Sequence, residues 1–598
     1  MKLPQFWKPQ PPSMHSSCAL NSGYAGVDPR RKKIQGGASA IIGKLENTCV
    51  RYPAGGRNPN FGREHSSWMV AVVRVYRTNI PSRTQAFLSP TTVMGETIQS
   101  AIRLPSELWL DIFMKNTERD DRLHQRLRTA RHCSQVCQLW RKILLSSASV
   151  WGRLVDLDYL QQGTDEWKDL ILSRAGSALL WITGRISLST WRFVVALLDE
   201  KWENVQILDV WESRVAFLYP EGTGAFFGRP APNLESLSIR LYNRWPFPKT
   251  FTLFSDVAPR LTEIEASFFL NINSTFTWLS QIHRITFHTS YANSNILSLL
   301  KWMPQLKCLR IYRAYSNTVL GINQGVDRDD PASVCLPQLQ SLQLFGPQSD
   351  LIPFLELIKP SPMCSITVSS TISSAPGNVQ DSNDGVQAPL SRFYRALFPW
   401  ILAYIKGRAP RDMSLQADVF EHFTMHDACK MFNLEKEHLK IEIALDNHCH
   451  AAIAELGTWS ESFSSVKQLI VCIEDNHDAL VPIYKAFTSV TELTLEAMHV
   501  AVGLAALHAD AEEEASILFP QLRSLRVMLV SKALSNNDIP KIVLDIVNFV
   551  KNRAGVGFPL SCLDFLVVDP RITILDADKE LLQKLPGLTV KIKSSSWD

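Results

Sequence analysis

Residues 336–344 read Leu-Pro-Gln-Leu-Gln-Ser-Leu-Gln-Leu, and residues 519–527 read Phe-Pro-Gln-Leu-Arg-Ser-Leu-Arg-Val. In both segments a proline-led turn precedes the pattern apolar-x-x-apolar-x-apolar, whose last two apolar residues alternate as in a β-strand. Copies of this pattern recur after Trp151, mostly about 21 to 33 residues apart. The clear copies are Val205/Leu208/Val210, Leu234/Leu237/Ile239, Ile282/Ile285/Phe287, Leu306/Leu309/Ile311, Leu339/Leu342/Leu344, Val466/Leu469/Val471, Val490/Leu493/Leu495, Leu522/Leu525/Val527 and Leu563/Leu566/Val568, with Leu261/Ile264/Ala266 as a weak copy.

Each copy predicts one strand, and stretches between copies, such as 293–302 and 538–551, have the apolar spacing of helices. One strand and one helix cannot bury their apolar sides alone, so neighbouring units must stack into a continuous core. The units resemble irregular leucine-rich repeats, although most lack the asparagine of the classical repeat. We therefore expect residues 153–598 to form an α/β solenoid of parallel strands with return helices. The alternative is an ordinary α/β domain whose strands happen to look alike.

Two polar stretches interrupt the repeats. The stretch near 370–390 is rich in turn-forming residues, which predicts a flexible insertion. The pattern then resumes with an expected helix over 393–406 and strands near 413–419 and 438–445. Acidic side chains cluster in residues 505–516, which indicates an exposed helix face more than a site for a basic partner.

A different pattern precedes the repeats. Residues 104–113 read Leu-Pro-Ser-Glu-Leu-Trp-Leu-Asp-Ile-Phe, and residues 136–144 read Val-Cys-Gln-Leu-Trp-Arg-Lys-Ile-Leu. Both have apolar side chains at helical spacing, and a proline is tolerated in a first helical turn. The charged stretch 116–131 separates them. Because two helices in about fifty residues bury little of their own apolar surface, we expect this segment to dock onto a partner.

These residues resemble the F-box domain, with the closest likeness to the large F-box families of mushroom-forming fungi. The Leu-Pro-x-Glu-Leu opening, the Ile-Phe pair, the Val-Cys-x-x-Trp-Arg segment and a distal tryptophan all occur within 104–151. The resemblance places an F-box at residues 101–152 and implies docking to the Skp adaptor, and through it to cullin, in a ubiquitin ligase. The residues it assigns to the adaptor contact are Leu104, Pro105, Leu108, Ile112, Phe113, Val136, Cys137, Trp140, Ile143 and Trp151.

Composition sets broader bounds. The chain has 598 residues, of which 45% are hydrophobic and 20% charged, as in folded soluble proteins. Its net charge is +4, but residues 1–100 hold 13 Lys and Arg against 4 Asp and Glu, so the basic excess lies in this segment alone. We expect residues 1–100 to be basic and largely disordered, with one strand-like stretch at 68–76. The basic run at 30–33 indicates a solvated tail more than a nuclear-import signal.

The cysteines and the apolar stretches bear on location. The 11 cysteines are scattered without paired spacing, which favours a reducing compartment, cytoplasmic or nuclear. No stretch approaches the roughly 18 apolar residues that span a bilayer, and the N-terminal residues lack the apolar core of a secretory signal. The repeats carry no basic stripe. We therefore expect neither a membrane nor a nucleic acid as a partner.

Catalytic and metal-binding patterns are weak. His422, His426 and Cys429 have ligand-like spacing for one helix face, but no second pair accompanies them. The histidines at 448 and 450 flank a cysteine on a predicted strand and would not converge on one ion. The chain has no Walker-type phosphate loop and no Gly-x-Ser-x-Gly elbow. We expect no catalytic residue, no metal, no cofactor and no enzymatic activity.

The two modules together predict a substrate-recognition subunit. The F-box would bind the Skp adaptor, and the repeat strands would hold an unknown substrate protein near the ubiquitin-conjugating enzyme. The alternative is a leucine-rich-repeat scaffold without a ligase role, in which the F-box-like hairpin caps the first repeat. The outward residues expected to contact the substrate are Ser238, Arg240, Arg310 and Tyr312.

Overall fold

The chain divides into two compact units, Met1–Ser100 and Ala101–Asp598. Every residue that the structure describes lies in the second unit. The segment 1–100, with its predicted disorder and its strand-like stretch, therefore lies outside the described residues. The computed structural model describes residues 104–118, 126–161, 164–212, 224–240, 252–267, 272, 275–288, 293–313, 333–359, 361–371, 383–417, 422–427, 439–444, 456–459, 461–473, 481–496, 518–529, 538–568 and 571–594.

Short helices begin the described part of the chain, and they are more numerous than the two that the sequence predicts. The second predicted helix is divided at Cys137, which is extended (φ −155°, ψ 166°) and whose sulfur accepts a hydrogen bond from the Trp140 amide at 3.5 Å. This bond caps the following helix. The charged stretch 116–131, expected to separate two helices, is helical from Arg126 onward. We call these four helices the helical module: Ser106–Lys115 (α3), Arg126–Val136 (α4), Gln138–Ser146 (α5) and Ala148–Gly152 (α6).

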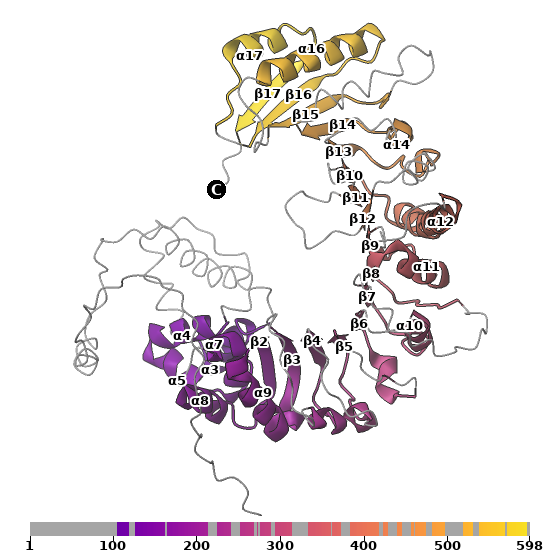
Figure 1. Cartoon of the computed structure of the whole chain (residues 1–598). Helices are drawn as coiled ribbons and strands as arrows, with labels where there is room; N and C mark the ends of the chain where they lie inside the picture. The colour runs from indigo at the N-terminus through magenta and orange to yellow at the C-terminus, as the bar shows by residue number, and fades with distance from the viewer. Residues whose placement is uncertain are drawn as a thin grey trace, which may run out of the picture. The chain divides into compact units, whose positions relative to one another are not determined.

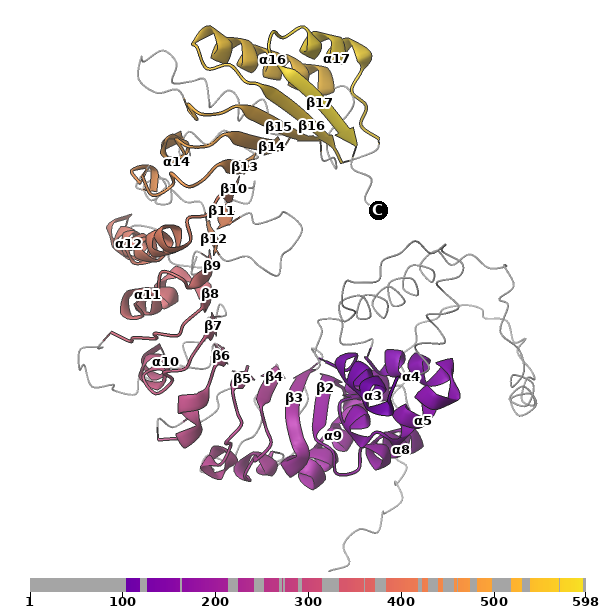
Figure 2. The ribbon, with the colours of Figure 1, turned by 180° about the vertical axis from the view of Figure 1, so that it is seen from behind.

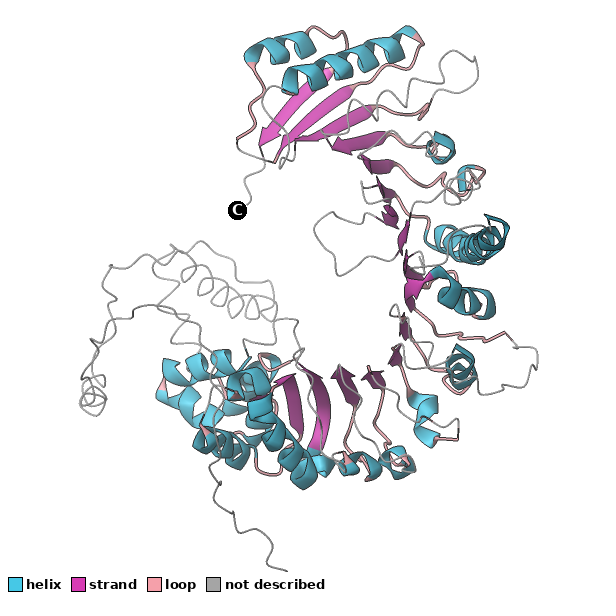
Figure 3. Cartoon of the chain, viewed as in Figure 1, coloured by secondary structure: helices cyan, strands magenta, loops and turns pink. Residues whose placement is uncertain are grey.

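In the described residues one large sheet of 17 strands follows, and most of its pairs are parallel. From β1 to β9, and again from β13 to β17, each strand pairs with the next strand along the chain. The register aligns the apolar positions of neighbouring strands, since Leu237 pairs with both Leu208 and Ile264 and all three are buried. Figure 3 shows the succession of strands. The strands are Val155–Asp156 (β1), Leu180–Ile186 (β2), Val205–Glu212 (β3), Ser236–Arg240 (β4), Glu263–Ala266 (β5), Arg284–Phe287 (β6), Cys308–Tyr312 (β7), Ser341–Pro347 (β8), Ser365–Thr371 (β9), Asp412–Ala417 (β10), His422–Asp427 (β11), Leu439–Ala444 (β12), Gln468–Ile473 (β13), Glu492–Glu496 (β14), Ser524–Leu529 (β15), Cys562–Val567 (β16) and Thr589–Ser594 (β17).

Helices connect many of the strands and cover one face of the sheet, where the apolar rows are buried. Figures 1 and 2 show α10, α11, α12 and α14 on this same face. The remaining helices are Leu157–Leu160 (α7), Asp165–Ala175 (α8), Leu188–Lys201 (α9), Trp202–Asn204 (η3), Ala225–Gly228 (η4), Leu253–Asp256 (η5), Thr277–Gln281 (η6), Asn293–Leu300 (α10), Gln348–Leu357 (α11), Asn383–Arg408 (α12), Val481–Ala486 (α14), Ile539–Gly555 (α16) and Asp576–Gln583 (α17). We call the opposite face the open face. Along β4 to β8 it carries the register-paired residues Ser238, Glu265, Thr286, Arg310 and Gln343.

Three strands change the regular order between β9 and β13. β12 pairs in parallel with β9, β11 pairs antiparallel with both β12 and β10, and β10 pairs in parallel with β13. His422 and His426 belong to β11, so their interpretation as part of a helix face is wrong. The alternation of buried Phe423 and Met425 with polar neighbours explains the strand. Cys429 lies outside the described residues, as do the residues at 448–450.

The repeat pattern predicts strands correctly at β3 to β8 and at β13 to β16, with one shift. In β16 the buried apolar residues are Leu563, Phe565 and Val567, so the pattern is displaced from the predicted Leu563/Leu566/Val568. The strands expected near 413–419 and 438–445 are present as β10 and β12, and the helix expected over 393–406 lies within α12. The sequence patterns miss β1, β2, β9, β11 and β17. The expected flexible insertion near 370–390 is partly helical, because α12 begins at Asn383; residues 372–382 and the acidic stretch 505–516 lie outside the described residues.

Candidate functional site

Three aromatic rings form the centre of the helical module. The ring centroids of Trp109 and Trp140 are 4.5 Å apart, and Phe113 lies 6.0 Å from Trp109 and 5.4 Å from Trp140. Trp109 and Phe113 are each 2% exposed. Because aromatic pairs contribute about 0.5–1.5 kcal/mol beyond the burial of area, this cluster fixes α3 against α5.

Large apolar side chains on the same helices face solvent. The exposed fraction is 48% for Leu108 on α3, 57% for Val136 on α4 and 39% for Leu139 on α5. The residues that match the F-box motif thus divide into three groups. Phe113 and Trp151 are buried, Leu104, Ile112, Trp140 and Ile143 are intermediate, and Pro105, Leu108, Val136 and Cys137 are exposed.

Trp151 is held inside the fold rather than at this surface. Its indole Nε1 donates a hydrogen bond to the Leu144 carbonyl at 2.8 Å, and the Arg174 guanidinium lies 4.7 Å from the ring centroid. Trp151 therefore joins α5 and α6 to α8, and its contribution to a partner surface would be indirect.

A buried arginine, which the sequence patterns do not single out, joins the helical module to the first strands of the sheet. Arg126 on α4 is 5% exposed, and its Nη2 donates to the Thr183 hydroxyl on β2 at 2.6 Å. Its Nη1 donates to the Thr117 carbonyl at 3.5 Å. Burial raises the pKa of Asp156 on β1, while the hydrogen bond from the Asp158 amide and the Arg126 charge act in the opposite direction.

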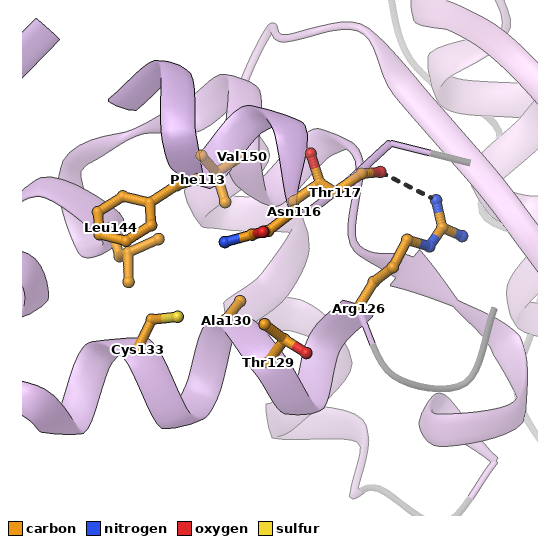
Figure 4. A pocket seen from close by; sticks show the side chains of 9 residues that line it. All are labelled: Phe113, Asn116, Thr117, Arg126, Thr129, Ala130, Cys133, Leu144 and Val150. Atoms are coloured by element: carbon orange, nitrogen blue, oxygen red, sulfur yellow. Dashed lines mark hydrogen bonds between the residues drawn. The ribbon is translucent and has the colours of Figure 1, made fainter. Parts of the chain in front are cut away.

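A small pocket lies beside this arginine, within the helical module. Figure 4 shows Arg126, Thr129, Ala130 and Cys133 of α4 facing Phe113 and the other lining residues across it. Its volume of about 10 Å³ gives room for roughly one water molecule. Organic ligands occupy pockets of roughly 300–1,000 Å³, so this pocket is a packing feature and not a ligand site.

The open face carries a charged and aromatic row at β3 to β5. Arg240 has a side chain that is 45% exposed, and its guanidinium lies 3.2 Å from Asp209 and 3.8 Å from Glu265. The same guanidinium lies 5.6 Å from the Trp211 ring centroid. Ser238 lies on the open face as expected, but it is only 4% exposed and donates to Glu265 at 3.5 Å, so, contrary to expectation, its side chain is not accessible to a substrate.

Stacked rings continue the open face over β6 to β8. Tyr312 lies between His288 and Phe345, with centroid distances of 5.2 and 4.6 Å and interplanar angles of 13° and 7°. Burial by itself would raise the pKa of Glu265, but the hydrogen bond with His288 and the charges of Arg240, His288 and Arg310 together lower it. Three of the four predicted substrate contacts, Arg240, Arg310 and Tyr312, thus lie on one partly exposed surface.

Groups that support catalysis are scarce in the described part of the chain. Burial raises the pKa of the Cys133, Cys364 and Cys472 thiols to about 12, which leaves each as an unreactive thiol near neutral pH. Within the described ranges, no three His, Cys, Asp or Glu side chains converge to hold a metal ion. Among the described helices, none has the length and apolar character needed to cross a bilayer.

Comparisons with known proteins add little. No family model and no curated protein matches this chain. Among solved structures, a lysine/ornithine decarboxylase from Vibrio vulnificus, complexed with putrescine, shares 15% identity at a TM-score of 0.15. The match covers 24% of this chain and 47% of the decarboxylase chain, so this chain spans less than half of the length of the decarboxylase. A likeness this small carries no argument about fold or function.

Proposed function

We propose that this chain is the substrate-recognition subunit of a Skp–cullin–F-box ubiquitin ligase. The helical module would serve as the F-box and bind the Skp adaptor, and the stacked strand-and-helix units would serve as a leucine-rich-repeat solenoid that binds a target protein. Catalysis would reside in other subunits. This chain would contribute proximity, by raising the effective concentration of the target near the ubiquitin-conjugating enzyme.

The observation that supports the proposal is the apolar surface of the helical module. Leu108 and Val136 match F-box motif positions and are 48% and 57% exposed, so the module presents apolar surface that a partner could cover. Their neighbours in the motif, Phe113 and Trp140, form the aromatic cluster that holds the helices in place. Truncation of central apolar contacts at a protein interface costs about 2 kcal/mol or more each, roughly a thirtyfold loss of affinity.

A second candidate is a scaffold protein without a ligase role, and one contact favours it. The hydrogen bond from Arg126 to Thr183 attaches the helical module to the sheet beside β1, where a cap of a repeat array would lie. Capping and adaptor binding use different residues of the module. Adaptor binding therefore discriminates the two candidates.

The test is co-purification of the full chain with the Skp adaptor. We expect the wild type to bind and the Leu108→Glu/Val136→Glu variant to lose at least about 100-fold in affinity, because both charges would enter an apolar groove. Leu544→Glu on α16 is the matched control, since Leu544 is equally exposed at 51% but lies outside the helical module. A folded wild type that binds no adaptor would eliminate the ligase proposal and leave the capped scaffold.

A further inference from the structure

The last strand of the sheet has one unpaired edge. β17 pairs with β16 through six residues from Thr589 to Ser594, and among the described residues no strand pairs with its other side. Figure 1 shows β17 at the margin of the sheet, next to α17. Backbone N–H and C=O groups along such an edge are a ready template for another strand.

The two faces of β17 differ in chemistry. Val590 and Ile592 pair with buried Leu563 and Phe565, so they lie on the helix-covered face, where Ile592 is still 41% exposed. Exposed Leu575 and Leu581, at 54% and 38%, belong to the same C-terminal part of the chain. The apolar layer of the sheet therefore reaches its last strand without being fully covered there.

Lysines occupy the other face of this strand. Lys591 and Lys593 are exposed, and the Lys593 ammonium lies 3.2 Å from Asp564 while its side chain remains 59% exposed. On β16 the register places Asp564 opposite Lys591 and Leu566 opposite Lys593. Arg526 on β15 also pairs with Asp564, at 3.3 Å, so this one carboxylate is shared by more than one cation and the edge keeps a net positive charge.

The direction of the backbone groups identifies which residues would receive a new strand. The Thr589 amide donates to the Ser561 carbonyl at 3.0 Å, so it points toward β16. Backbone groups of alternate residues in a strand point to opposite neighbours. The N–H and C=O groups of Val590 and Ile592 therefore point outward, away from β16.

We propose that the free edge of β17 receives an extended acidic segment of a partner protein, in which carboxylates alternate with apolar side chains. The apolar residues would extend the layer formed by Val590 and Ile592, and the carboxylates would lie beside Lys591 and Lys593. Backbone hydrogen bonds supply affinity in this mode of recognition, and the alternating side chains supply specificity.

Charge argues against a second copy of this chain as the occupant. A two-fold axis would pair β17 with itself in the antiparallel sense. Centred on Lys591 this pairing sets Lys591 opposite its own copy, and centred on Ile592 it sets Lys591 opposite Lys593. Like charges directly opposite each other destabilise a strand pair. An acidic partner removes this repulsion.

The test measures binding of a fluorescent peptide, Thr-Val-Glu-Val-Glu-Val-Thr, to the full chain by anisotropy. We expect saturable binding, and about tenfold weaker binding by Ile592→Pro, which removes an outward N–H but leaves the bonds to β16 intact. Ile592→Val keeps the N–H and is the matched control, with less than about threefold change. Lys591→Glu is expected to weaken this peptide and to favour a peptide with lysine in place of glutamate.

Three results would overturn the proposal, and circular dichroism confirms that each variant is folded. The first is the absence of saturable binding by the wild type up to about 1 mM peptide. The second is equal binding by Ile592→Pro and Ile592→Val. The third is equal binding of the glutamate and lysine peptides, which would mean that the lysines only keep the edge unpaired.

Discussion

The first and last strands of the sheet differ in how much of their surface is buried. At one end β1 is only two residues long, and both Val155 and Asp156 are almost fully buried, at 0% and 2% exposure. At the other end Thr589, Lys591, Ile592 and Lys593 of β17 are all exposed. A sheet with an apolar layer needs cover where that layer would otherwise meet water. The comparison teaches that helices cover the first strands, whereas within the described residues the last strand stays accessible.

The covered end is also fixed by polar contacts, which an apolar cap does not need. Arg126 reaches from α4 to Thr183 on β2, and its charge acts on Asp156 of β1. Buried polar groups tolerate little displacement, because each lost partner leaves a desolvated group behind. The helical module therefore has one orientation relative to the first strands. At the open end Lys593 and Arg526 pair with Asp564, and the buried Arg553 on α16 donates hydrogen bonds to the Leu518 and Phe519 carbonyls.

The largest expected effect comes from breaking the covered end. Arg126→Ala removes the hydrogen bond to Thr183 and the positive charge that acts on Asp156, so we expect the free energy of unfolding to fall by about 3 kcal/mol. Urea unfolding followed by tryptophan fluorescence measures it. Arg128→Ala is the matched control, because Arg128 is exposed on the same helix, and its effect should stay within about 0.5 kcal/mol. Equal effects of the two variants would show that the buried contact does not fix the module.

A smaller effect is expected at the open end, and it separates the core from the accessible edge. Leu582 on α17 is fully buried whereas its neighbour Leu581 is 38% exposed. Leu582→Ala should lower the free energy of unfolding by about 2 kcal/mol, at the low end for buried leucines because the terminal unit can relax. Leu581→Ala should change it by less than about 0.5 kcal/mol. A large cost for Leu581→Ala would mean that this surface is covered in solution, contrary to the contrast between the ends.

Much of the sheet follows from local pattern. The spacing apolar-x-x-apolar-x-apolar predicts β3 to β8 because one buried residue before the strand and two alternating within it recur in each unit. β2 escapes the pattern because it is buried on both faces from Leu180 to Gly184, so apolar and small residues run without alternation. The strands expected near 413–419 and 438–445 are present as β10 and β12, but β11 between them and its antiparallel pairing with both were not predicted. The periodicity of one segment does not specify which strands it pairs with.

The candidate site was less predictable than the sheet. Motif likeness identifies Leu108 and Val136 but does not separate them from Phe113 and Trp151, which the fold buries. Arg126 lies in a charged stretch that resembles a solvated linker, and only its contact with Thr183 shows that it is buried. Alternation correctly places Ser238 on the open face, yet its burial depends on Asp209 and Glu265 of the adjacent strands. Such contacts between distant segments have no signal in a single sequence.

The smallest expected effect is a pH dependence of the free energy of unfolding that arises from Asp156 at the covered end of the sheet. Burial raises the pKa of Asp156 above its ordinary value of 3.8, so the folded chain holds this proton more tightly than the unfolded chain. Between the pKa of Asp156 in the unfolded chain and its higher pKa in the folded chain, the folded state binds more protons than the unfolded state. The contribution of Asp156 to the free energy of unfolding therefore falls as pH rises through this window. Asp156→Asn removes this titration and keeps an oxygen that accepts from the Asp158 amide at 3.0 Å.

We therefore expect the stability of Asp156→Asn relative to wild type to increase with pH across that window and to become constant above it. Urea unfolding at a series of pH values from about 4 to 8 measures the difference, and Asp111→Asn on the exposed side of α3 reports effects unrelated to burial. In an Arg126→Ala background the window should extend to higher pH, because the cation that lowers the pKa of Asp156 is gone. If the stability difference between Asp156→Asn and wild type is independent of pH in both backgrounds, Asp156 is hydrated. The covered end would then be as accessible to water as the open end.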